Sequence, residues 1–169
     1  FQKKHGFKFI IIEDSAHAFG TKTDKEIIGN TGNISSFSFQ AIKHLTSVDG
    51  GCINFNFKED VDRAKLLRWY GIDREENRKD FRCESDILNV GFKFHMNDVN
   101  AYIGRMNFEP VTKDLLKIHQ SNGDYYNANL KNVQNVELMN YSNEYSVPFW
   151  IYTIKVKNRD SFMEHMKNK

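Results

Sequence analysis

The sequence predicts an α/β fold, and three stretches support that prediction. The apolar run Phe9–Ile12 stops abruptly at Glu13 and Asp14. A continuous run of this kind is typical of a strand covered on both faces, as in parallel sheets. A second strand is expected over Ile34–Phe39, where apolar and polar residues alternate, and apolar residues at helical spacing follow over Asp60–Tyr70.

The two predicted strands bring an acid and a lysine to one edge of the sheet. Asp14 follows the first strand directly, and Lys43 lies in the polar turn after the second. Ligands of open α/β sheets bind at the carboxyl ends of the strands, so these two side chains are candidates for one site. Their position alone leaves two plainer roles open, because Asp14 could cap the next turn and Lys43 could be a surface lysine.

Composition bounds the class of protein. The chain has 169 residues, which predicts one domain, or one domain with part of another. Hydrophobic residues make up 40% and charged residues 27%, the proportions of an ordinary globular protein. The net charge of +2 gives no indication of a nucleic-acid or membrane partner. Cys52 and Cys83 have no metal-binding spacing and are expected to be free thiols in the reducing cytoplasm.

Further elements are expected along the rest of the chain. Asn97 or Asp98 should cap a helix that runs through Met106 and breaks at Pro110. The stretch Ile72–Leu88 is charged and irregular, and it is either a solvent loop or part of a substrate pocket. The other expected elements are a strand over Cys52–Phe57, a helix over Val111–Lys131, strands over Val136–Met139 and Phe149–Val156, and a helix over Arg159–Lys169.

Four motifs occur in order, and together they resemble one enzyme family. They are Ile12-Glu13-Asp14-Ser15-Ala16-His17-Ala18-Phe19-Gly20, Gly29-Asn30-Thr31-Gly32-Asn33-Ile34, Phe37-Ser38-Phe39-Gln40-Ala41-Ile42-Lys43-His44-Leu45-Thr46 with Asp49-Gly50-Gly51, and Gly91–Ala101. This set resembles the DegT/DnrJ/EryC1/StrS family of pyridoxal-phosphate-dependent sugar aminotransferases of fold type I. The resemblance extends from Phe9 to about Lys131.

The resemblance implies a specific architecture. Residues 1–131 would be the later half of a fold type I large domain, a mostly parallel sheet with helices that includes one antiparallel strand. Residues 132–169 would begin a small α+β C-terminal domain. Members of the family are roughly twice as long and form homodimers, so the resemblance implies that this chain is a fragment.

The resemblance also assigns site residues. It implies that Lys43 forms a Schiff base with pyridoxal 5′-phosphate and then moves protons at the substrate carbon. Asp14 would pair with the pyridine nitrogen, His17 would lie near the ring hydroxyl, and Ser38 would bind the phosphate. Lys93 stands where the family usually has an asparagine that reaches the phosphate of the partner subunit, and a lysine can bind phosphate as a point charge. No metal site is expected.

The function implied is transfer of an amino group from an amino acid, with glutamate the expected donor, to a nucleotide-linked keto-sugar. Two alternatives remain: another sugar reaction of the same cofactor, or a non-catalytic fragment that keeps the motifs. A plain nucleotide-binding module is disfavoured, because no glycine-rich strand–turn–helix fingerprint is present. The sequence does not identify the sugar, the nucleotide or the carbon that receives the amino group.

Overall fold

The computed structural model describes residues 4, 6, 9–75, 87–141 and 144–169. Cys83 and most of the irregular stretch after Ile72 lie outside this part of the chain. The elements follow in the order β1 (Ile12–Asp14), β2 (Lys22–Thr23), β3 (Ile34–Ser38), β4 (Gly51–Asn54), α2 (Lys58–Leu67), α3 (Asp98–Pro110), the π-helical turn η1 (Val111–Leu115), α4 (Leu116–Leu130), β5 (Val136–Leu138), β6 (Tyr145–Ser146), β7 (Ile154–Val156) and α5 (Arg159–Lys167).

The central sheet has the strand order β1-β3-β4 and confirms the α/β prediction. Strands β1 and β3 are parallel, with Asp14 opposite Ser36, whereas β4 runs antiparallel to β3. Gly51 begins β4 where the backbones come closest, because a Cβ there would lie 2.4 Å from the carbonyl oxygen of Phe37. The strand after the Gly-Gly pair is therefore the expected antiparallel one.

The prediction that Phe9–Ile12 forms a strand covered on both faces is wrong for the described part of the chain. Strand β1 lies at one edge of the sheet, and backbone pairing begins where the Ile34 N–H donates to the Ile11 carbonyl (3.2 Å). Ile10 is 77% exposed and Ile12 is 68% exposed. The described elements leave these side chains uncovered, so the apolar run indicates a surface that another element can cover.

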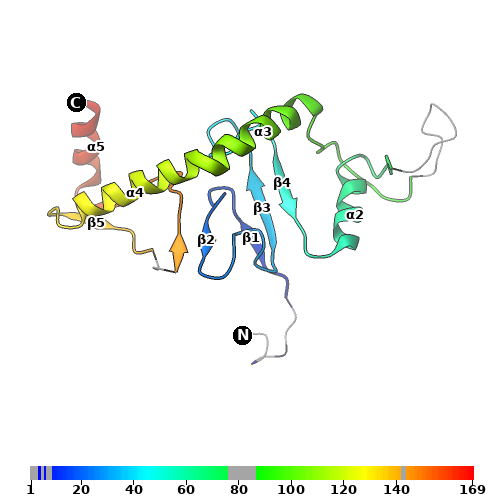
Figure 1. The fold of residues 1–169 in the computed structure, drawn as a ribbon, viewed down its shortest axis with the longest axis horizontal. Coiled ribbons are helices and arrows are strands. Elements are labelled where there is room, and N and C mark those ends of the chain that lie inside the picture. The colour runs from blue at the N-terminus through cyan, green and yellow to red at the C-terminus, as the bar shows by residue number, and fades with distance from the viewer. Residues whose placement is uncertain (1–3, 5, 7–8, 76–86, 142–143) are drawn as a thin grey trace.

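Helices α3, η1 and α4 form one continuous rod, which Figure 1 shows crossing the molecule from near α2 to near α5. The predicted break at Pro110 is therefore wrong. Proline has no N–H to donate to the preceding turn, and the helix passes this point by widening into the π-helical turn. The Thr112 hydroxyl donates to the carbonyl oxygens of Phe108 (2.8 Å) and Glu109 (3.3 Å), which keeps this region of the helix hydrogen-bonded.

Helix α3 begins as expected and fixes the loop between β3 and β4. The Asn97 side chain accepts a hydrogen bond from the Asn100 N–H (2.9 Å), which makes Asn97 the N-cap. Further along, Asn100 donates to the Asp49 carbonyl (3.2 Å) and Asn107 to the Thr46 carbonyl (3.0 Å). Because residues at this spacing share one helix face, α3 holds both ends of the turn that follows Lys43.

The C-terminal part is less regular than predicted. Strand β7 covers only the end of the predicted strand over Phe149–Val156, and it pairs antiparallel with β5. Strand β6 pairs with β2, which connects this part to the loop after β1. Among the described residues, no helix combines the length and the apolar character that a membrane crossing requires.

Candidate active site

Asp14 and Ser38 lie at the same end of two neighbouring parallel strands. Asp14 is exposed at the end of β1, and β3 continues past its pairing with that residue as far as Ser38. Oδ1 of Asp14 accepts a hydrogen bond from the Ala16 N–H (3.2 Å), so this carboxylate also caps its own turn. The Ser38 hydroxyl accepts from the Gln40 N–H (3.4 Å), and a hydroxyl that accepts one bond still has a proton to donate.

Lys43 lies in the tight turn that follows β3. Its backbone N–H donates to the Gln40 carbonyl (2.9 Å), and its side chain is half-buried. The Nζ atom lies 3.8 Å from the centroid of the Trp150 indole, in a cation–π contact. The same indole donates from Nε1 to the carbonyl oxygen of Ile42 (2.6 Å). Trp150 therefore contacts both the head of this lysine and the backbone beside it.

His17 joins the same group of side chains. Its ring centroid lies 3.9 Å from that of Trp150, with 38° between the ring planes. His17 and Lys43, two of the residues predicted for the site, thus both contact Trp150, which the sequence patterns did not single out. Trp150 lies in a predicted strand, and no motif marked it as more than a packing residue.

Glu13 has a structural role next to the site. Its carboxylate accepts hydrogen bonds from Thr31 (2.7 Å), Asn33 (2.7 Å) and Ser35 (2.9 Å), which tie the end of β1 to the loop that enters β3. Partial burial raises the pKa of Glu13, but the hydrogen bonds from Asn33, Thr31 and Ser35 together outweigh it and hold that pKa below its ordinary value. Glu13 thereby fixes the strand end from which Asp14 projects.

His44, next to Lys43 in the chain, is only 6% exposed. Its ring meets the His119 ring edge to face, with centroids 4.6 Å apart. Burial and the neighbouring His119 lower the pKa of His44 to about 4, although the Phe149 carbonyl opposes the shift. His44 is therefore neutral at pH 7, and it packs the loop of Lys43 against helix α4.

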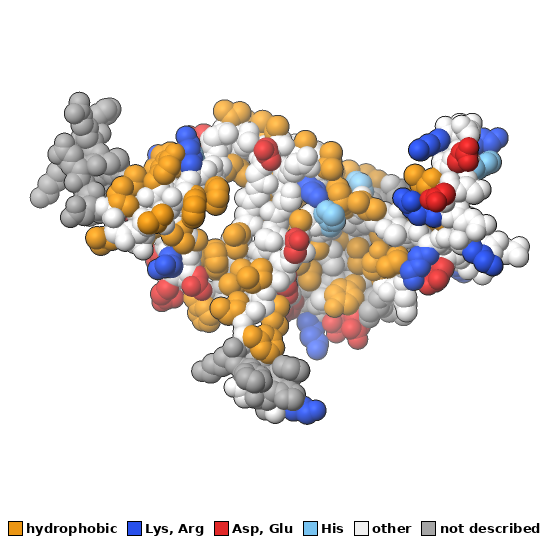
Figure 2. All heavy atoms as spheres, turned by 180° about the vertical axis from the view of Figure 1, so that it is seen from behind, with side chains coloured by type: hydrophobic (Ala, Val, Ile, Leu, Met, Phe, Trp, Pro, Cys, Tyr) orange, Lys and Arg blue, Asp and Glu red, His pale blue; other side chains and the backbone are white. Residues whose placement is uncertain are grey.

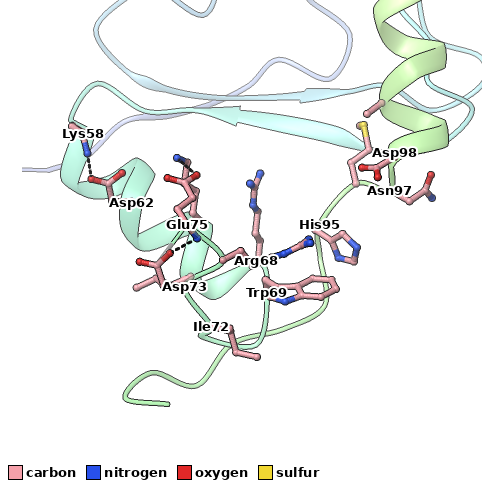
Figure 3. Close-up of a pocket in the computed structure, with 15 residues that line it drawn as sticks. Lys58, Asp62, Arg68, Trp69, Ile72, Asp73, Glu75, His95, Asn97 and Asp98 are labelled. Atoms are coloured by element: carbon pink, nitrogen blue, oxygen red, sulfur yellow. Dashed lines mark hydrogen bonds and ion pairs between the residues drawn. The ribbon is translucent and has the colours of Figure 1, made fainter. Parts of the chain in front are cut away.

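Lys93 lies in a different region, around Trp69 at the end of α2. Its backbone pairs with that of Trp69, and its Nζ lies 5.9 Å from the Trp69 ring centroid. A cavity of about 720 Å³ opens beside this ring, and Figure 3 shows His95 against it, with ring centroids 4.0 Å apart. The cavity wall carries both charges, including the ion pair of Lys65 with Glu75 (2.7 Å). The contacts of Lys93 are thus with Trp69 and not with the group around Trp150.

Residues 2–169 match the family model of the DegT/DnrJ/EryC1/StrS aminotransferase family. The chain belongs to this family. Membership confirms the resemblance inferred from the motifs. Within the described residues, no group of three or more His, Cys, Asp or Glu side chains is arranged to hold a metal ion.

The chain is similar to solved structures and to curated proteins. AtS13 from Actinomadura melliaura is 40% identical and the sugar aminotransferase CalS13 from Micromonospora echinospora is 30% identical, each with a TM-score of 0.89 over 99% of this chain. A UDP-4-amino-4,6-dideoxy-N-acetyl-beta-L-altrosamine transaminase from Campylobacter jejuni is 24% identical over 92% of this chain. The chain spans 44% of the length of each of the two structures and 36% of that of the transaminase.

Proposed function

We propose that the protein to which this chain belongs transfers an amino group from an amino acid, with glutamate the expected donor, to a nucleotide-linked keto-sugar. The observation that carries the proposal is the contact group of Lys43, Trp150 and His17 beside the strand ends of Asp14 and Ser38. Family membership supports amino transfer, and the name of the Campylobacter jejuni relative supports a nucleotide-linked sugar as the acceptor.

The side chains of this group fit pyridoxal 5′-phosphate as its cofactor. The cofactor has an aldehyde, a pyridine nitrogen, a ring hydroxyl and a phosphate, and the site offers an amine at Lys43, a carboxylate at Asp14, an imidazole at His17 and a hydroxyl at Ser38. Each is the chemical partner of one of these groups. When bound, the cofactor accepts the electron pair released at the substrate carbon.

The residues of the chain would then have distinct tasks. Lys43 would supply the amine that holds the cofactor, and its Nζ would take up and return the proton at the substrate carbon. Asp14 holds a proton on the pyridine nitrogen, because a carboxylate beside that nitrogen favours its charged form. Ser38 donates its hydroxyl proton to a phosphate oxygen. His17 orients the ring through its hydroxyl group.

We also propose that the protein is a homodimer in which Lys93 contacts the phosphate of the partner subunit. Lys93 lies between Phe92 and Phe94, whose rings are stacked with centroids 5.1 Å apart. Phe94 is 76% exposed and Val90 is 87% exposed, and Figure 2 shows hydrophobic side chains over much of one face of the molecule. Exposed apolar segments of this kind favour association with another protein surface.

We propose the domain division at residues 131 and 132, with the β5–β7 pair and α5 belonging to the small domain. We propose a cytoplasmic location, which the free thiol of Cys52 supports.

The direct test is an amino-transfer assay with the full-length protein, pyridoxal phosphate, glutamate and a UDP-linked 4-keto sugar, read out by mass spectrometry of the sugar nucleotide. The expected product carries one amino group in place of the keto oxygen. A protein that consumes the sugar without incorporating nitrogen from labelled glutamate would favour another sugar reaction of the cofactor. A protein that takes up no cofactor would favour the non-catalytic alternative.

A further inference from the structure

We propose that Trp150 is a positioning residue that holds the side chain of Lys43 in the site. The inference rests on the proposed function, in which Lys43 is the reactive amine. It assigns a role in the site to Trp150, which lies in the strand predicted over Phe149–Val156.

Trp150 contacts both the ammonium group of Lys43 and the backbone next to Lys43. The face of the indole lies 3.8 Å from Nζ, where the negative face of the ring attracts the ammonium group. The edge of the same indole donates a hydrogen bond to the Ile42 carbonyl (2.6 Å), in the residue that precedes the lysine. One rigid ring therefore limits the motion of the lysine head relative to its own backbone. The contact with His17 extends this support to the turn after β1.

Trp150 is itself held by helix α4 through a set of contacts on one helix face. The Phe149 carbonyl lies 3.2 Å from Nδ1 of His119, the Ser146 hydroxyl donates to the Gln120 side chain (3.0 Å), and the Tyr152 hydroxyl donates to the Asn127 side chain (2.8 Å). Residues at this spacing lie along one side of a helix. Helix α4 thus contacts the segment that carries Trp150 both before and after this residue in the chain.

A glycine lets this segment approach the helix. Gly123 is the buried residue of α4, and the Phe149 ring lies directly against it. A Cβ at this position would be 2.0 Å from Cδ2 of Phe149, so any larger residue must push the ring away. Because Phe149 precedes Trp150, we expect Gly123→Ala to shift the indole away from Lys43 without altering either residue.

The chain offers a matched control in its second tryptophan. Trp69 also lies beside cations, with Arg74 at 4.8 Å and Lys93 at 5.9 Å from its ring centroid. The same substitutions at Trp69 and Trp150 therefore remove similar ring contacts, and only those at Trp150 remove a contact with Lys43.

The first experiment uses tryptophan emission and needs no cofactor. In the Trp69→Phe chain, the remaining emission comes from Trp150, and Lys43→Met should change its wavelength or intensity because a nearby ammonium perturbs the indole. Lys93→Met in the same background should leave the emission unchanged. An emission that responds to neither substitution would overturn the proposal.

The second experiment measures how strongly Lys43 is preferred over the other lysines as the site of labelling. Each variant is incubated with pyridoxal phosphate, reduced with borohydride and digested, and the share of label on Lys43 is compared with that on the other lysines. Trp150→Leu should lower this share about three- to tenfold, whereas Trp69→Leu should leave it unchanged, as expected from the loss of one cation–π contact. Trp150→Phe keeps an aromatic face and should give an intermediate share, and Gly123→Ala should resemble Trp150→Leu.

The outcomes separate this inference from the proposed function. A folded Trp150→Leu chain with the original share of label on Lys43 would overturn the positioning role, and the same result in Trp150→Phe would do so if the leucine variant fails to fold. If the unsubstituted full-length protein is labelled at another lysine, the proposed function fails, and the emission experiment still decides whether Trp150 holds Lys43.

Discussion

The rings of His44 and His119 meet edge to face with their centroids 4.6 Å apart, and this contact joins the loop of Lys43 to helix α4. The folded protein holds the pKa of His44 at about 4, well below the ordinary value of a histidine. Between about pH 6.5 and pH 4 the unfolded chain therefore binds a proton that the folded chain does not.

Stability should accordingly fall as the pH is lowered through this window. The charged form of histidine is the protonated one, and the folded protein lowers the pKa of His44. Protonation therefore favours the unfolded chain, by up to about 1.4 kcal/mol per pH unit. His44→Gln should flatten the dependence of the unfolding free energy on pH in this range, whereas His165→Gln on the exposed helix α5 should leave it unchanged. Denaturant unfolding at pH 4.5, 5.5 and 7 measures this, and equal slopes for both variants would refute the prediction.

Glu13 gives a second pH-dependent prediction. Because its folded-state pKa is lowered, its contribution to stability is present above the ordinary pKa of glutamate and is lost as the pH falls through the lower, folded value. Glu13→Gln should destabilise the fold at pH 7 by about 1.5–3 kcal/mol, the scale of a hydrogen bond to a charged group. The difference from the unsubstituted chain should shrink toward pH 3.

The control for Glu13 is Glu26→Gln, an exposed glutamate in the turn after β2. Its unfolding free energy should match that of the unsubstituted chain at both pH values. A Glu13→Gln chain as stable as the Glu26→Gln chain at pH 7 would mean that the three hydrogen bonds at Glu13 contribute nothing to the fold.

Sequence patterns anticipated the α/β fold and the positions of Asp14 and Ser38 near strand ends, because these depend on short local motifs. They placed the first strand over Phe9–Ile12, whereas β1 spans Ile12–Asp14. They failed at Pro110, where the effect of proline on a helix depends on whether the backbone can widen and on a hydroxyl at Thr112. They also missed Trp150, because its contact with Lys43 joins residues more than a hundred positions apart. The approach of Phe149 to Gly123 is likewise a contact between segments that are distant in the sequence.

Gly123→Ala should therefore destabilise the protein even though alanine favours helices by about 1 kcal/mol over glycine. The added methyl group would overlap the Phe149 ring, and relieving this overlap costs about 1–3 kcal/mol in a packed interior. Thermal unfolding monitored by circular dichroism measures the net effect. Gly104→Ala is a useful comparison, because its Cβ would lie 3.1 Å from Cβ of Ser47 and meets a milder contact. A Gly123→Ala chain that melts above the unsubstituted chain would contradict the packing argument.

Asp14→Asn tests the acid of the site in the full-length protein. The substitution keeps the shape and removes the negative charge, so amino transfer should fall by at least about 100-fold, as with the loss of a group that stabilises charge in a transition state. Asp24→Asn, in the turn after β2, should leave the rate unchanged. Steady-state kinetics with glutamate as donor decides the matter, and a near-normal rate in Asp14→Asn would exclude its role at the pyridine nitrogen.

The central claim is that Lys43 is the residue that attaches the cofactor. The most direct measurement is borohydride reduction of the full-length protein with pyridoxal phosphate, followed by peptide mapping. One reduced adduct is expected, on the peptide that contains Lys43; it should be absent in Lys43→Ala and retained in Lys167→Ala on the exposed helix α5. A reduced adduct on another lysine, with Lys43 unmodified, would contradict it.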